Sequence, residues 1–347
     1  MATDPATELS TDVGALLAAQ EPKGAETAGV GPWELARRRL RRNKVALVFG
    51  ALFVLLVLCA LVAPIWANDI AHTTASANHL ADEIAVGGKK TLVVSLDGVP
   101  IGPTWSGKFF LGADGNGRDV MVRLLYGARN SLFIGIVASL ITTFLAVTLG
   151  VLAGYFRGWV DAGISRGLDI MWAFPVLLLG IALGVSLNVG GLQVGPLHIE
   201  GASNWIPTLI IGVVGAVYLA RPVRGQVLSL REKEFIEAAR SQGASHWRIM
   251  FGELLPNLSS TLLVFFPLLV ANAILLESAL SFLGAGVQPP APSWGTMLAD
   301  GIKLLITSPH LTIAPGLMLV LTVLSLNIFG DGVRDALDPR AKVRLEH

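Results

Sequence analysis

The sequence predicts an all-α, polytopic membrane protein with six transmembrane helices and a small extracytoplasmic insert. Of its 347 residues, 53% are hydrophobic and 15% are charged, and the mean hydropathy is +0.63, whereas about a quarter of the residues in a soluble domain are charged. A spanning helix needs about 20 mostly apolar residues. Six runs meet or approach that length, and lysines and arginines gather at alternate ends of them, as in a chain that crosses the membrane repeatedly.

The N-terminal part consists of a tail, a basic flank and the first span. Residues 1–32 are rich in alanine, glycine, threonine and acidic residues without apolar periodicity, which predicts a disordered cytoplasmic tail. A cleavable signal peptide would instead begin basic and then turn apolar. Residues 33–66 contain the flank and the span at 45–66. The cations of the flank place the N-terminus in the cytoplasm. These cations are Arg37, Arg38, Arg39, Arg41, Arg42 and Lys44.

Residues 67–130 form the predicted extracytoplasmic segment. The segment carries several lysines and arginines, but loops of this length cross the membrane largely regardless of charge. Within it, residues 91–101 alternate between apolar and polar side chains around Asp97-Gly98. This pattern predicts a small β-hairpin.

Residues 131–331 form the predicted core, with five further spans at 131–152, 170–187, 205–220, 258–276 and 311–329. The spans at 170–187 and 205–220 are short and edged by polar residues. The connections at 153–169 and 221–257 carry arginines, whereas those at 188–204 and 284–310 hold only Lys303 between them. This asymmetry places both chain ends inside and makes residues 332–347 a cytoplasmic tail.

The inner segment at about 229–252 has the pattern of two short helices. Ser229 and Glu232 fit a capping box that would begin the first helix, and Gly243 fits its C-terminal stop. A second short helix is expected at 245–250. The small Ala238 and Ala239 would let a partner's surface approach closely, so we interpret the segment as a docking element. A solvated amphipathic loop is the alternative, and the membrane tethers exclude a DNA-binding helix pair.

Several motifs carry a resemblance to a known family. Glu237-Ala238-Ala239, followed by Gly243, Ile249 and Pro256, resembles the EAA motif of permease subunits of binding-protein-dependent ABC importers. Residues 111–129, 277–295 and 330–340 narrow the likeness to the C-type permease of dipeptide and oligopeptide importers, over about residues 33–340. Ala113, Ala285 and the long stretch at 85–105 depart from the family pattern.

The resemblance implies the type I importer permease fold and a place in the bacterial cytoplasmic membrane. It implies that the chain forms half of the pathway for di- or oligopeptides, pairing with a homologous permease as a heterodimer. It further implies two ATP-binding subunits, which use ATP and Mg, and an extracytoplasmic substrate-binding protein. The segment at 229–252 would then be the coupling helix that engages an ATP-binding subunit. Its coupling residues would be Glu237, Ala238, Ala239, Arg240, Gly243, Ile249 and Pro256.

The residues themselves predict no enzyme in this chain and no bound cofactor or metal. Neither Gly88-Lys89-Lys90 nor Gly107-Lys108-Phe109 completes a phosphate-binding loop, so ATP hydrolysis must come from another polypeptide. Gly163, Ser165 and Gly167 formally match a hydrolase elbow but lie between membrane helices. The histidines are scattered without metal-ligand spacing. Lipid is an expected partner and nucleic acid is not.

Candidate pathway or gate residues lie in and after the fifth span. Glu277 closes this span; it either lines the pathway or its outer gate, or ends the helix at headgroup level. Ser278 and Ser281 adjoin it, and Asn272 is a weaker pore-facing candidate. An ion-coupled secondary transporter is the alternative function. Its coupling would normally leave buried carboxylates or broken helices near mid-membrane, and the almost charge-free spans count against it. A membrane-embedded enzyme would need a catalytic set that the spans lack.

Overall fold

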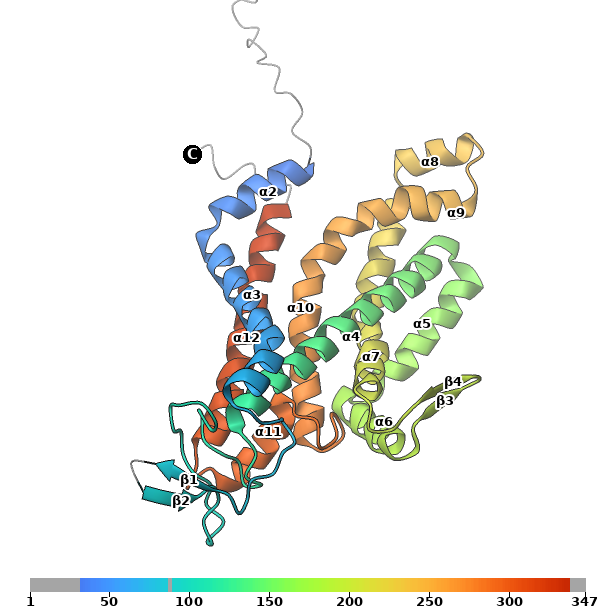
Figure 1. Cartoon of the computed structure of the whole chain (residues 1–347). Helices are drawn as coiled ribbons and strands as arrows, with labels where there is room; N and C mark the ends of the chain where they lie inside the picture. The colour runs from blue at the N-terminus through green and yellow to red at the C-terminus, as the bar shows by residue number, and fades with distance from the viewer. Residues whose placement is uncertain (1–31, 87–88, 338–347) are drawn as a thin grey trace, which may run out of the picture.

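The computed structural model describes residues 32–86 and 89–337. Its long helices lie side by side in a bundle, and the described chain begins and ends at the same end of it (Figure 1). We call this end, which also carries α8, the α8 end, and the opposite end the α11 end. The predicted tail at 1–32, apart from Pro32, and most of the tail at 332–347 lie outside the described residues.

The helices and short strands follow one another along the chain. The first half consists of α2 (Pro32–Arg42), α3 (Lys44–Ile65), the π-helical turn η1 (Trp66–Ile70), β1 (Glu83–Val86), β2 (Lys89–Leu92), α4 (Val120–Phe156), α5 (Gly158–Trp172) and α6 (Val176–Gly190). The second half consists of β3 (Leu192–Val194), β4 (Leu197–Ile199), α7 (Trp205–Leu230), α8 (Glu234–Ser241), α9 (His246–Arg248), the π-helical η2 (Ile249–Leu254), α10 (Leu255–Phe282), α11 (Trp294–Gly301), the 3₁₀ turn η3 (Ile302–Leu304) and α12 (His310–Leu337).

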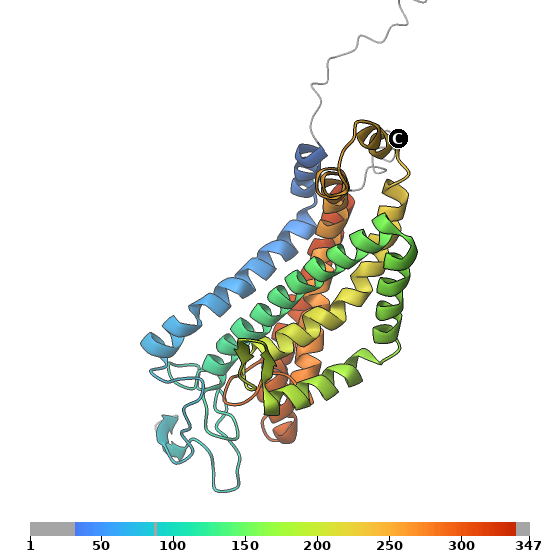
Figure 2. The ribbon, with the colours of Figure 1, turned by 90° about the vertical axis from the view of Figure 1, so that its right-hand side faces the viewer.

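Five helices in the described part of the chain are long and apolar enough to cross a membrane. They are Lys44–Ile70, Val120–Phe156, Trp205–Leu230, His246–Phe282 and His310–Leu337. A sixth span exists only if α5 and α6, which are bent by 85° at their junction, count as one. Figure 2 shows α6 turning away from α5 across the bundle.

A single helix over 170–187 is therefore a wrong prediction. The chain breaks between Trp172 and Val176, where Pro175 precedes α6. Proline cannot donate an amide hydrogen bond, and it disfavours a helical conformation at the preceding residue, here Phe174. Most of the predicted run therefore forms α6, and only residues 170–172 belong to α5, which begins at Gly158 inside the predicted connection at 153–169.

The predicted boundaries of the inner segment also need correction. Ser229 does not cap a helix, because α7 continues to Leu230 and α8 begins after Lys233. The helix persists past the predicted end of the fourth span because Val223 and Val227 are buried against α4. The second helix is not a separate short one, because α9 runs through η2 directly into α10.

The segment before α4 holds two small β elements. Strands β1 and β2 pair antiparallel with Glu83 opposite Leu92. The predicted hairpin at 91–101 is reduced to a turn at Asp97-Gly98, closed by one bridge between Val94 and Pro100. Helix α4 starts at Val120, well before the predicted span at 131–152, because Asp119 caps it by accepting the amide hydrogen of Val122 (3.0 Å).

Close approach of α4 and α7 forms the centre of the bundle. A Cβ at Gly150 would lie 2.7 Å from Val223, and one at Gly154 would lie 2.8 Å from Val227. Small residues allow helix backbones to approach closely, as in membrane helix pairs generally. The closely packed α4 and α7 therefore support the α8 end of the molecule.

Candidate functional site

Helix α8 projects beyond the bundle at its α8 end (Figure 1). Glu237, Ala238 and Arg240 are exposed on it, and Ala239 is half-buried. Gly243 is exposed in the turn that follows. The structure thus brings five of the predicted coupling residues together on one projecting helix and its turn.

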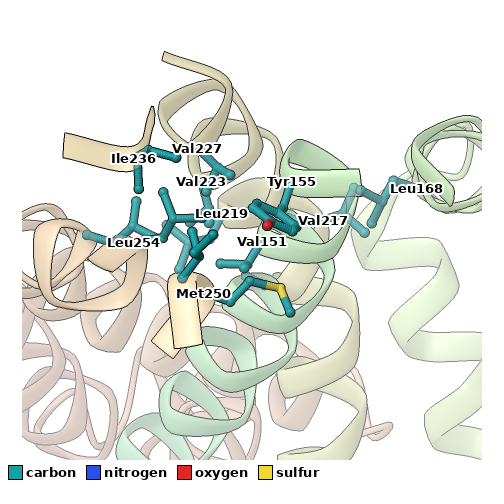
Figure 3. Packing of buried hydrophobic residues seen from close by; sticks show 14 residues of the cluster. Val151, Tyr155, Leu168, Val217, Leu219, Val223, Val227, Ile236, Met250 and Leu254 are labelled. Atoms are coloured by element: carbon teal, nitrogen blue, oxygen red, sulfur yellow. The ribbon is translucent and has the colours of Figure 1, made fainter. Parts of the chain in front are cut away.

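The opposite face of α8 packs on the bundle. Ile236 is 0% exposed and belongs to an apolar cluster with Val223 and Val227 of α7 and Leu254 of η2. Figure 3 shows Ile236 beside these side chains. Ile249 is buried in the same cluster, whereas Pro256 is exposed in the first turn of α10. Ile249 therefore belongs to the apolar cluster on which α8 packs and is not part of the exposed surface of that helix.

The turn after α8 depends on a left-handed glycine. Gly243 has φ +76°, a conformation that costs other L-residues about 1–2 kcal/mol. Its amide donates to the carbonyl of Arg240 (2.9 Å), and that of Ala244 donates to the carbonyl of Ala239 (3.0 Å). A Cβ at this position would meet nothing within 4 Å. The requirement for glycine is therefore conformational and not steric, and the predicted helix stop is confirmed.

Tyr155, in the last turn of α4, connects the segment to the bundle. Its hydroxyl forms a 2.8 Å hydrogen bond with Nδ1 of His246, and its carbonyl accepts from Nη1 of Arg231 (2.7 Å). The guanidinium groups of Arg231 and Arg240 each lie 5.9 Å from the centre of its ring. Burial, together with the charges of Arg157 and Arg240, lowers the pKa of Arg231. Sequence reasoning missed Tyr155 because its partners are distant in the chain.

Ion pairs join the corner between α4 and α5 to α7 and the start of the inner segment. Arg157 binds Glu232 at 2.6 Å. Arg224 donates two hydrogen bonds to Asp161, at 2.5 and 2.6 Å. Farther along α5, Arg221 contacts Asp169 at 2.7 Å. The Arg157–Glu232 and Arg221–Asp169 pairs are exposed, and such pairs contribute about 0–1 kcal/mol each. The Arg224–Asp161 pair is partly buried and bidentate, a geometry that orients α5 on α7.

A buried polar cluster lies near the α11 end. Glu277 is 0% exposed and accepts hydrogen bonds from Ser131 of α4 (2.8 Å) and Ser281 (2.7 Å). Ser278 lies 3.4 Å from the same carboxyl group. The Ser131 hydroxyl also accepts from the amide of Trp294 (3.3 Å). We call Glu277, Ser131, Ser278 and Ser281 the Glu277 cluster. It joins α10 to α4 and to the start of α11.

Asn272 lies apart from this cluster, in an open cavity of about 620 Å³ between α4, α6, α7 and α10. The lining is apolar except for Thr142, Tyr218 and Asn272. The Asn272 side chain is exposed and hydrogen-bonds to no other described residue. Ten residues separate it from Phe282 at the end of α10, a distance of about 15 Å or half the hydrocarbon thickness. Asn272 therefore lies within the span that contains α10, and the cavity lies between apolar helices.

Comparison with known proteins places this arrangement in a family. Residues 146–343 match the family described as "Binding-protein-dependent transport system inner membrane component". The chain belongs to this family. Residues 31–81 match the N-terminal transmembrane domain of oligopeptide transport permease C.

Two curated relatives of this permease cover nearly its whole length. It is 37% identical over 311 residues to a glutathione transport system permease protein of Pectobacterium atrosepticum, covering 90% of this chain and 92% of the relative. It is 36% identical over 321 residues to a dipeptide transport system permease protein of Alkalihalophilus pseudofirmus, covering 92% and 94%. The predicted resemblance to the peptide-type ABC permeases is confirmed.

A solved structure supports the fold of the permease. A chain of the MetNI methionine ABC transporter, in an inward-facing conformation, aligns with a TM-score of 0.51 at 20% sequence identity. The alignment covers 62% of this permease and 97% of that chain. This likeness concerns the fold alone. Together with the spanning helices, it confirms the all-α polytopic architecture predicted from the sequence.

Two other kinds of site considered from the sequence, a metal site and a hydrolase elbow, can be compared with the structure of residues 32–86 and 89–337. No group of three or more His, Cys, Asp or Glu side chains there is arranged to hold a metal ion. Ser165 lies inside α5, where its hydroxyl donates to Asp161 (3.0 Å). The strand, sharp turn and helix of a hydrolase elbow are therefore not present around it.

Proposed function

We propose that this permease is one of two homologous membrane subunits of an ATP-driven importer of di- or oligopeptides in the bacterial cytoplasmic membrane. Relatives named for glutathione and dipeptide transport, at 36–38% identity, support a peptide cargo. The alternative of an ion-coupled transporter is not favoured by this family. ATP and Mg would be used by two separate ATP-binding subunits, and an extracytoplasmic binding protein would deliver the cargo.

The observation that carries the coupling role is the two-sided packing of α8. Ile236 anchors one face in the apolar cluster, while Glu237, Ala238 and Arg240 are exposed on the projecting side. Small alanines allow close approach, and the flanking charges allow pairing with a partner. We place the α8 end in the cytoplasm, because lysines and arginines concentrate at cytoplasmic ends of membrane helices. Closure of the ATP-binding subunits would then move α8 and, through it, the spans.

Purification of the native complex tests this function. The wild-type chain is expected to co-purify with a second homologous permease and an ATPase that carries a phosphate-binding loop. Glu237→Lys and Gly243→Val are expected to reduce recovery of the ATPase at least about tenfold, because one reverses a contact charge and the other strains the turn. Quantitative mass spectrometry of the purified complexes measures both results.

Gly243→Asn is the matched control for the turn. Asparagine tolerates left-handed backbone far better than a β-branched residue, and open space surrounds the position. This variant should therefore keep most of the ATPase. Equal losses with Asn and Val would refute the conformational role of Gly243. Recovery of the wild-type chain without any ATPase would refute the proposed importer.

We assign the cavity at Asn272 to the transport pathway. An unpaired amide within a membrane span is costly against lipid, because hydrocarbon offers no hydrogen-bond partner. A water-accessible pathway removes this cost. Glu277, Ser278 and Ser281 are enclosed in protein, so we propose that they hold the outer gate together and do not contact cargo.

Cysteine labelling separates a pathway from a lipid-facing surface. In a Cys59→Ser background, which removes the only cysteine of the chain, Asn272→Cys is expected to react with a membrane-impermeant maleimide. Val320→Cys is the control. Val320 also lies ten residues from the α11 end of its helix, in an exposed apolar stripe of α12 with Ile313, Leu317 and Leu324. Asn272→Cys should react at least about tenfold faster, because lipid excludes the water that a maleimide reaction needs. Equal rates would remove Asn272 from the pathway.

A further inference from the structure

Helix α2 lies across the α8 end of the bundle, next to α12 and away from α8 (Figure 1). Asn43 alone separates α2 from α3, and its side chain caps α3 by accepting from the amide of Ala46 (3.1 Å). At this corner, a Cβ on Gly332 of α12 would collide with Ala46. Ala36 is buried. One face of α2 is therefore fixed on the bundle, and the opposite face is free.

The free face of α2 is basic. Trp33, Arg37 and Arg41 recur every four residues and so lie along one line of the helix. Arg38 and Arg42 form the adjacent line, and all five side chains are exposed. Glu34 is the only acidic residue of α2, and it pairs with Arg38 at 2.6 Å. No described residue forms an ion pair with Arg37, Arg41 or Arg42. We call Trp33, Arg37, Arg38, Arg41 and Arg42 the α2 basic face.

The length of α3 sets the depth of this face in the membrane. α3 has 22 residues, about 33 Å at 1.5 Å per residue, which matches a hydrocarbon core about 30 Å thick. Val48, Val54 and Leu61 are exposed along it, as expected against lipid. Since a single residue joins the two helices, α2 lies at the level of the lipid headgroups. Tryptophan is also enriched at that level, which fits the exposed Trp33.

We infer that the α2 basic face binds the headgroups of anionic phospholipids. A guanidinium group makes paired hydrogen bonds to phosphate oxygens, and the attraction of basic side chains to an anionic surface falls off within a Debye length. A lipid site fits better than a protein site, because the chain continuity of α2 and α3 keeps the face at headgroup depth. Lipid binding by this face is independent of the proposed coupling role and cargo. The proposed orientation decides only which leaflet supplies the lipid, here the cytoplasmic one.

Native mass spectrometry of the purified complex tests the inference, with 1-palmitoyl-2-oleoyl phosphatidylglycerol and the zwitterionic phosphatidylcholine of the same chains as probes. The wild-type complex is expected to retain the anionic phosphatidylglycerol in preference to phosphatidylcholine and to lose it as the salt concentration is raised. The triple variant Arg37→Gln, Arg41→Gln, Arg42→Gln should bind it at least about tenfold more weakly, since each cation near the surface adds to the attraction.

The control variant removes the same number of exposed cations elsewhere. Lys90→Gln, Arg129→Gln and Lys303→Gln change the net charge equally but lie outside α2, so this variant should retain the lipid. If both triple variants lost phosphatidylglycerol equally, the binding would depend on net charge alone, and the site on α2 would be overturned. Because cations beside a span also guide insertion, each single glutamine variant of α2 is measured too. A wild-type complex that does not prefer the anionic lipid overturns the inference whatever the variants show.

Discussion

Glu277→Ala is expected to destabilise the permease by roughly 2–6 kcal/mol, because it leaves two buried hydroxyl donors without their acceptor at about 1–3 kcal/mol each. The donors are those of Ser131 and Ser281, at 2.8 and 2.7 Å from the carboxylate oxygens. The Ser281 hydroxyl also accepts from the amide of Val287 (2.9 Å). Loss of the carboxyl group should therefore loosen the loop before α11 as well. Thermal unfolding of the purified complex measures the change.

Two further variants separate the hydrogen bonds from general packing. Glu277→Gln keeps the volume and one acceptor oxygen but replaces the other oxygen by a donor, so a smaller loss is expected. Ser278→Ala is the matched control inside the same cluster, because its hydroxyl lies 3.4 Å from the carboxyl group and contributes little. A melting temperature for Glu277→Ala equal to that of Ser278→Ala would contradict the role of the Glu277 cluster.

The sequence predicts the parts of this molecule that local patterns govern. Long apolar runs predict the spans, and a glycine after a polar helix predicts the turn at Gly243, which has φ +76°. The third span could not be predicted in the same way. Its apolar composition suits a membrane segment, but Pro175 divides it, and the 85° bend depends on how the two halves pack on neighbouring helices. The family motif likewise marks α8, but not the residues that hold it.

The supporting residues escaped prediction because their partners are far apart in the chain. Tyr155 and His246 are separated by 91 positions, and Ser131 and Glu277 by 146. Single-sequence patterns report periodicity along an element, not contacts between elements. The sequence marks Glu277, as an ionisable residue near lipid depth, and the adjoining Ser278 and Ser281. The contact with Ser131 could be found only once α4 and α10 were placed together.

The contacts of Tyr155 suggest how motion at α8 would reach the cavity. Tyr155 touches α9 through His246 and the inner segment through Arg231, and the next residues turn into α5. Arg221 binds Asp169 of α5 and lies 4.7 Å from the centre of the Trp172 ring. Trp172 in turn packs on Tyr218, which lines the cavity. These contacts form a continuous path of packed side chains from the inner segment to the cavity wall, and we propose that a shift of α8 would move α5 and this wall along it.

Tyr155→Ala is accordingly expected to abolish peptide uptake by reconstituted complexes while ATP hydrolysis persists. The substitution removes a ring that is 4% exposed and packs in the apolar cluster under α8, and truncation of a buried aromatic costs about 3–5 kcal/mol. Tyr155→Phe keeps the ring and removes only the hydroxyl bond to His246. For Tyr155→Phe, the amount of peptide taken up per ATP hydrolysed should fall several-fold but remain measurable. Transport and hydrolysis assays on the same proteoliposomes give both quantities.

A double-mutant cycle decides whether the hydrogen bond itself transmits the motion. If it does, Tyr155→Phe and His246→Ala affect the same bond, and the double variant should be no worse than the more damaging single one, a non-additivity of about 0.5–3 kcal/mol for residues in contact. Independent effects would instead add, and would assign Tyr155 a packing role only. Because α8 keeps its Ile236 anchor in both single variants, the ATPase should still co-purify. Its loss from Tyr155→Phe would mean that the hydroxyl positions the docking helix, and the proposed route from α8 to the cavity would fail.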